Sequence, residues 1–153
     1  MNNKIAFSKS FLNSILDNSF GIPNSTYPKT DIYIGLGIEF DEDAFAFTKE
    51  PVAKGFTILS QPIAFNEPIN GIIRNTNPIE WPKATCDWTD DNETISYVGL
   101  YYRKETDTVD GNIQDPYEYE LICVLPLVPE ETVKLNEKLV LNANSIQIRL
   151  ANR

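Results

Sequence analysis

The side chains that could do chemistry in this sequence are mainly carboxylates. The chain of 153 residues has 22 Asp and Glu side chains and no histidine. Without histidine it lacks the usual general base, the imidazole metal ligand and every Ser-His or Cys-His pair. Paired carboxylates can hydrolyse glycosides when they face each other across a cleft, but spacing along a chain does not establish that geometry. We therefore expect no enzyme, and keep a hydrolase with acidic pairs as a distant alternative.

Two acidic loops offer the oxygen ligands that a calcium ion accepts. Their candidate ligands are Asp87, Asp90, Asp91 and Glu93 in one loop, and Asp107, Asp110, Asn112 and Asp115 in the other. Neither loop follows the EF-hand spacing, so ordinary solvation of polar loops is the preferred interpretation. We therefore expect no metal and no cofactor.

The two cysteines, Cys86 and Cys123, lack the CxxC spacing of a zinc site. We expect both to be buried, reduced thiols, with a single disulfide between them as the alternative. The Gly35-Leu36-Gly37 sequence lies inside a predicted strand rather than before a helix, so it is not a phosphate-binding loop.

The charge of the chain limits its partners. The net charge is −9, and residues 31–131 hold twenty of the 22 acidic side chains. A body this acidic argues against nucleic acid, whose phosphates require a basic face. No apolar run reaches the roughly eighteen residues of a membrane span. The first residues lack the apolar core of a signal peptide, so none is expected.

The elements around these residues are predicted to be strands. Ten prolines, seven glycines and short runs of β-branched and aromatic residues favour an all-β fold. We expect an antiparallel β-sandwich of about eight strands with one short N-terminal helix. The predicted strands cover residues 31–38, 55–59, 63–65, 72–74, 79–81, 94–102, 117–127, 130–134 and 139–150. Residues 40–49 are predicted to be a long loop. Residues 1–30 form the helix and connector, and residues 31–153 form the sandwich domain.

The stretch from Asn75 to Tyr102 contains both tryptophans, and we expect it to anchor the sandwich as strand, turn, acidic loop and strand. Four residues in it are assigned to the structural core: Trp81, Pro82, Trp88 and Gly99. The strand at 31–38 has one apolar face, while Tyr33, Gly35 and Gly37 leave its other face nearly bare. We therefore expect another part of the structure to pack closely against this nearly bare face.

The N-terminal helix is predicted over residues 7–18, with Ser8 or Ser10 as its cap. Its apolar face carries five large side chains, Phe7, Phe11, Leu12, Ile15 and Leu16. A helix this short is marginal alone and needs a partner surface. We propose this face as an assembly interface; the alternative is that it docks on its own β domain.

Motifs in a fixed order run through most of the chain. They are Ile32-Tyr33-Ile34-Gly35-Leu36; Glu50-Pro51 with Gly55-Phe56; Asn75, Ile79, Trp81, Pro82, Ala84, Thr85, Asp87 and Trp88; Val98-Gly99-Leu100-Tyr101; and the alternating strand Ser145 to Leu150. Over residues 7–150 this order resembles a family of small virion structural proteins of tailed bacteriophages, often described as tail-fibre-like or minor structural proteins. The chain departs from that pattern in the acidic insert near Asp41, in the loop 103–116 and in lacking a glycine-rich run after Glu50.

The resemblance implies a structural subunit on the capsid, neck, tail or fibre of a virion, assembled in the bacterial cytoplasm. It implies no enzyme and no cofactor. The expected partners are other virion proteins and further copies of the chain, without nucleic acid or membrane. The rival hypothesis is a carbohydrate- or receptor-binding sandwich in which Tyr101, Tyr102 and Tyr117 stack on sugars.

Overall fold

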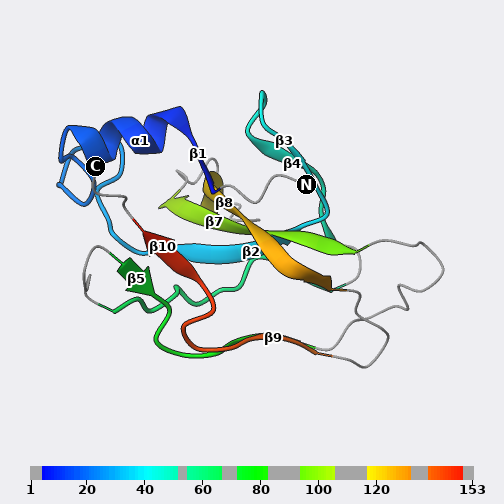
Figure 1. Cartoon of the computed structure of the whole chain (residues 1–153). Helices are drawn as coiled ribbons and strands as arrows, with labels where there is room; N and C mark the ends of the chain where they lie inside the picture. The colour runs from blue at the N-terminus through cyan, green and yellow to red at the C-terminus, as the bar shows by residue number, and fades with distance from the viewer. Residues whose placement is uncertain are drawn as a thin grey trace, which may run out of the picture.

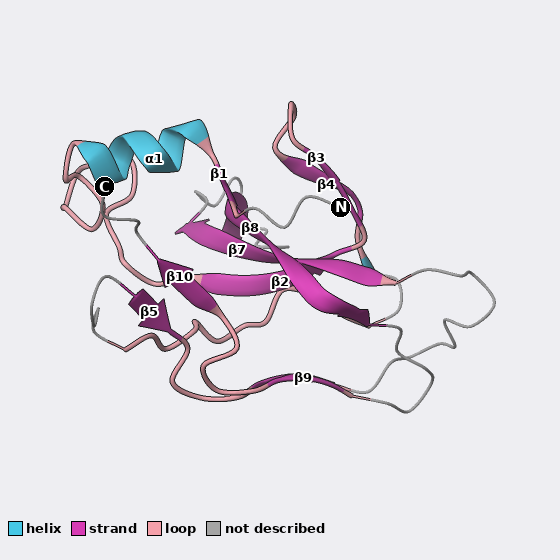
Figure 2. Cartoon of the chain, viewed as in Figure 1, coloured by secondary structure: helices cyan, strands magenta, loops and turns pink. Residues whose placement is uncertain are grey.

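The computed structural model describes residues 5–51, 55–66, 72–82, 94–105, 117–131 and 138–149. Within these residues the fold is all-β, with antiparallel sheets and one short helix, α1 (Lys9–Leu16) (Figures 1 and 2). The predicted fold class is therefore confirmed. No helix in this part of the chain is long and apolar enough to cross a membrane.

Four strands form the main sheet, in the spatial order β1-β8-β7-β2. They are β1 (Ala6–Phe7), β2 (Tyr33–Gly37), β7 (Ile95–Glu105) and β8 (Tyr117–Glu131). The three longer strands coincide with predicted ones, because β-branched and aromatic residues dominate them. Strand β1 was not predicted; it adds an edge to the sheet by pairing Phe7 with Cys123.

Six further strands form three two-stranded sheets. They are β3 (Glu39–Asp41) with β4 (Ala46–Lys49), β5 (Ile72–Arg74) with β10 (Gln147–Arg149), and β6 (Ile79–Trp81) with β9 (Leu139–Leu141). In Figure 1 the β6–β9 pair lies below the main sheet and the β5–β10 pair lies at its left end, which gives a sandwich-like arrangement. The predicted closing strand 139–150 is thus two strands, interrupted by a turn in which Asn144 has a φ of 65°.

The prediction of a loop at residues 40–49 is wrong, because β3 and β4 form a hairpin. The Asp41 carboxylate makes the tight turn possible by accepting hydrogen bonds from the N–H groups of Asp43 at 2.9 Å and Ala44 at 3.2 Å. The acidic residues, which favour a loop by their type, here build the turn of the hairpin.

The predicted strands at 55–59 and 63–65 are also not found. This segment runs beside β2 with widely spaced bonds, from Leu59 N–H to the Ile34 carbonyl at 3.0 Å and from Ile63 N–H to the Ile32 carbonyl at 2.7 Å. Pro62 lies between these bonds and has no N–H to donate, so a regular ladder cannot form.

The core lies between the main sheet and the layer below it. Alternate residues of β2 and β7 point into it, including Ile34, Leu36 and Leu100, and we call this side of the sheet the core face. Trp81 of β6 packs there with no exposed surface, and its indole N–H donates to the Thr57 carbonyl at 3.1 Å.

A β-bulge in β8 changes which of its side chains enter the core. Leu100 pairs with Cys123 and Tyr101 pairs with Leu121, so Ile122 is the extra residue. Cys123 therefore shares the core face with Leu100, whereas Leu121 shares the opposite face with Tyr101. Simple alternation along the predicted strand 117–127 would place Leu121 and Cys123 on one face, but alternation restarts after the bulge and separates them.

Asn75, predicted only as a turn residue, is a fully buried junction between distant segments. Its side-chain amide donates to the carbonyls of Asn77 at 2.9 Å and Asn142 at 3.0 Å, and its side-chain oxygen accepts from Ile146 N–H at 2.9 Å. All hydrogen-bonding capacity of the amide head is directed inward, so Asn75 ties the end of β5 to the turn before β10.

Candidate functional site

Helix α1 is built by local signals that the sequence shows in part. The Ser8 hydroxyl caps it by accepting a hydrogen bond from Phe11 N–H at 3.2 Å, as predicted for one of two serines. The helix has eight residues rather than the twelve predicted, because Phe7 belongs to β1 and the chain turns at Asn18, where φ is 57°.

One side of α1 docks on the protein's own domain. The Phe11 ring packs edge-on against Phe20, with centroids 5.2 Å apart, and against Tyr27 at 6.1 Å. Ser14 is buried on the same side, and its hydroxyl donates to the Phe11 carbonyl at 2.7 Å. Phe7, in β1, is also packed against the core. Two of the five residues assigned to an assembly interface, Phe7 and Phe11, therefore face inward.

The other three residues of that set form an exposed apolar surface, which we call the outer face of α1. Leu12, Ile15 and Leu16 are 41%, 38% and 80% exposed. They follow the i, i+3, i+4 spacing and so lie side by side on the helix. The outer face is the candidate functional site, because it is apolar, contiguous and held on a docked element.

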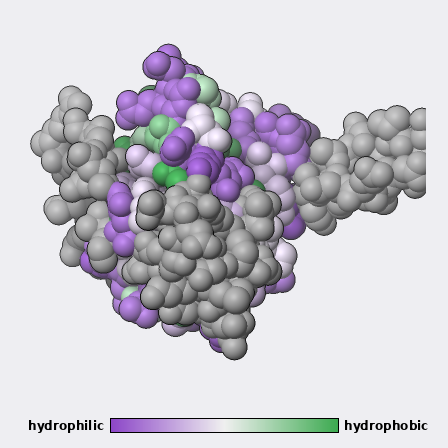
Figure 3. All heavy atoms as spheres, turned by 90° about the vertical axis from the view of Figure 1, so that its right-hand side faces the viewer, coloured by the Kyte–Doolittle hydropathy of each residue, from purple (hydrophilic) through white to green (hydrophobic). Residues whose placement is uncertain are grey.

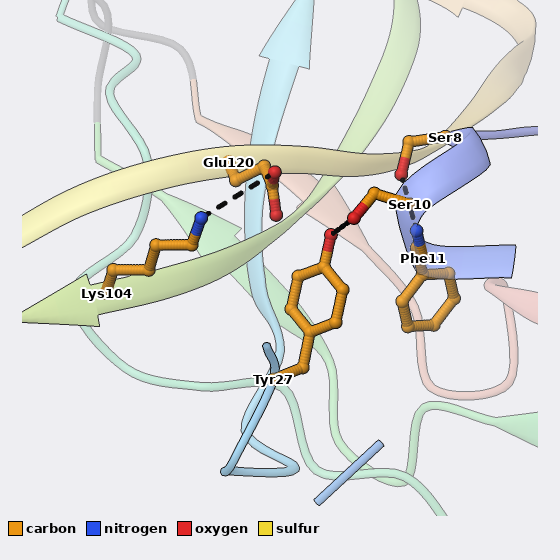
Figure 4. A network of polar contacts seen from close by, with 6 residues as sticks. All are labelled: Ser8, Ser10, Phe11, Tyr27, Lys104 and Glu120. Atoms are coloured by element: carbon orange, nitrogen blue, oxygen red, sulfur yellow. Dashed lines mark hydrogen bonds and ion pairs between the residues drawn. The ribbon is translucent and has the colours of Figure 1, made fainter. Parts of the chain in front are cut away.

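A polar network fixes α1 to the sheet beneath it (Figure 4). The hydroxyl of Tyr27, a fully buried residue, donates to the Ser10 hydroxyl at 2.8 Å. Glu120 of β8 lies beside them and forms an ion pair with Lys104 at 3.8 Å. Burial is the main cause that raises the pKa of Tyr27, so this phenol stays neutral and acts as a donor.

The second carboxylate oxygen of Glu120 is buried and has no hydrogen-bond partner among the described residues. The Tyr27 hydroxyl also interacts with this carboxylate. Because a phenol O–H rotates, it can donate to either Ser10 or Glu120. Because the Tyr27 hydroxyl donates to Ser10 here, this oxygen of Glu120 is left without a hydrogen bond in the network that positions α1.

The side of the main sheet opposite the core, which we call the glycine face, is covered by the β3–β4 hairpin. A Cβ atom added at Gly99 would lie 2.7 Å from the Phe47 ring, and one added at Gly37 would overlap the same ring. The expectation that something packs closely on the bare positions is confirmed: Phe47 packs at Gly37, and Tyr101 and Ile58 pack at Gly35.

Tyrosines occupy the rest of the glycine face. The Tyr119 ring lies edge-on to Tyr33 at 5.9 Å and to Tyr101 at 6.4 Å between centroids. Burial raises the pKa of Tyr101 above its ordinary value, and the adjacent Glu50 carboxylate adds to the rise. Tyr101 and Tyr102 are 6% and 2% exposed, so they cannot stack on a sugar as the carbohydrate-binding hypothesis requires.

The structure places the other residues singled out in the sequence in the core, at the surface or outside the described part of the chain. Trp81 is fully buried and Gly99 is buried in the centre of the sheet. Pro82 is exposed, because β6 ends at Trp81 and the proline lies just beyond the ladder. Trp88, Cys86, the Tyr117 side chain and the ligands proposed for both calcium loops lie outside the described residues.

Cys123 is a buried free thiol in β8, and burial raises its pKa to about 12. A thiol that is neutral at physiological pH is a poor nucleophile and a poor metal ligand. Within the described residues, no group of three or more His, Cys, Asp or Glu is placed to hold a metal ion.

Sequence reasoning missed Tyr27, which connects α1 to the sheet. It lies in a connector that contains two prolines and one glycine, where no hydrophobic periodicity indicates burial. Its aromatic character between Pro23 and Pro28 was the one available signal.

Comparison with known proteins adds no relative, since no protein-family model, curated protein or solved structure matches this chain.

Proposed function

We propose that this protein is a non-enzymatic structural subunit of a tailed-bacteriophage virion, attached at the capsid, neck or tail through protein–protein contacts. The observation that carries the proposal is the outer face of α1. Its three large apolar side chains project from a helix whose opposite side is already docked. A partner subunit that covers them would gain roughly 1.5–3 kcal/mol for each side chain that becomes fully buried.

The sequence resemblance supports the proposal that the partner is a virion protein. The ordered motifs, in a resemblance that spans residues 7–150, are similar to those of small virion structural proteins. Three of these motifs fall on β2, β6 and β7, so they coincide with the strands that build the domain. The expected partners are other virion proteins or further copies of the chain.

The rival carbohydrate-binding function loses its main support, because Tyr101 and Tyr102 are buried.

The sequence alone also favours a deletion test, in which removing residues 1–20 leaves a soluble monomer that no longer assembles. The structure makes deletion unsuitable. It would remove β1 from the sheet edge and Phe11 and Phe20 from the core, so folding would be lost with assembly.

Point substitutions give a cleaner test. Leu16→Lys on the outer face should fold normally, because Leu16 is 80% exposed, yet be lost from particles. Val140→Lys, at a 45% exposed site on β9, is the matched control and should be retained. The measurement is the copy number of each variant in purified particles by quantitative mass spectrometry. A wild-type protein that is absent from particles, or a Leu16→Lys variant incorporated like the wild type, would contradict the proposal.

A further inference from the structure

We draw no further inference here: the strongest candidate, the cluster of half-buried aromatic rings that Phe40 and Phe47 of the β3–β4 hairpin form with Tyr97 of β7 on a mainly hydrophilic side of the molecule (Figure 3), is an apolar surface patch, and nothing in the described residues shows what covers it.

Discussion

The two faces of the main sheet are sealed in opposite ways. On the core face, aliphatic side chains such as Ile34 and Leu100 meet the large indole of Trp81. On the glycine face, Gly37 and Gly99 leave room that the Phe47 ring occupies. The core face is stabilised by large side chains that fill the space beneath the sheet. The glycine face is stabilised because its glycines have no side chain and so leave space for the Phe47 ring. The same sheet should therefore respond to opposite kinds of substitution on its two faces.

The largest effect is expected from removing volume on the core face. Trp81→Ala should lower the free energy of unfolding by about 3–5 kcal/mol, because it leaves a cavity and frees the Thr57 carbonyl. Urea denaturation followed by circular dichroism measures the change. Trp81→Phe, which keeps most of the volume, is the control and should cost less. A loss below about 1 kcal/mol for the alanine variant would show that the core can collapse around this site.

Adding volume on the glycine face should have the next largest effect. Gly37→Ala places a methyl group inside the Phe47 ring and should cost about 1–3 kcal/mol. In a Phe47→Ala background that cost should disappear, which a double-mutant cycle measures. Gly35→Ala is the control, because its new methyl would meet Tyr101 and Ile58 instead. If Phe47→Ala relieved both glycine variants equally, the specific fit of the ring would be refuted.

At neutral pH the smallest effect concerns the dryness of the core face, because the loss caused by Cys123 begins only above about pH 9. Burial raises the pKa of Cys123 from 9.0 to about 12, so the folded state resists thiolate formation. The stability that this shift contributes is complete below pH 9 and is lost as the pH rises towards 12. Between these values the wild type should lose up to about 1.4 kcal/mol per pH unit more than Cys123→Ala. Parallel curves of unfolding free energy against pH would show that water reaches the thiol.

Buried Tyr101 adds a loss in the same direction on the glycine face, because its pKa is also raised. The comparison of wild type with Cys123→Ala cancels that loss, since Tyr101 is present in both proteins. A Tyr101→Phe variant measures it separately and tests whether the glycine face is as dry as the core face.

The strands of the main sheet were predictable because their signal is local. β2, β7 and β8 are dense in β-branched and aromatic residues, and alternation placed Ile34 and Leu36 on one face. The bulge at Ile122 was not predictable, because it depends on how β7 and β8 pair and no residue type marks it. The hairpin was missed because Asp41, Glu42 and Asp43 have low strand propensity, while its stability comes from Phe47 packing on distant glycines.

The candidate site was predictable only in part. Periodicity identified four apolar residues of α1 but also assigned Phe7 to it, and it could not show which of these side chains face the domain. Phe11 faces inward because Tyr27 and Phe20, from the connector, pack against it. The outer face is what remains after this docking.

The pairing of β1 with β8 also sets the order of events on the ribosome. Ala6 and Phe7 leave the ribosome early, yet their partners Val124 and Cys123 are made more than a hundred residues later. At 5–20 residues per second this delay is on the order of ten seconds. Until then α1 is too short to persist as a helix. The outer face therefore becomes a rigid surface only when the strand that contains Val124 and Cys123 has been translated.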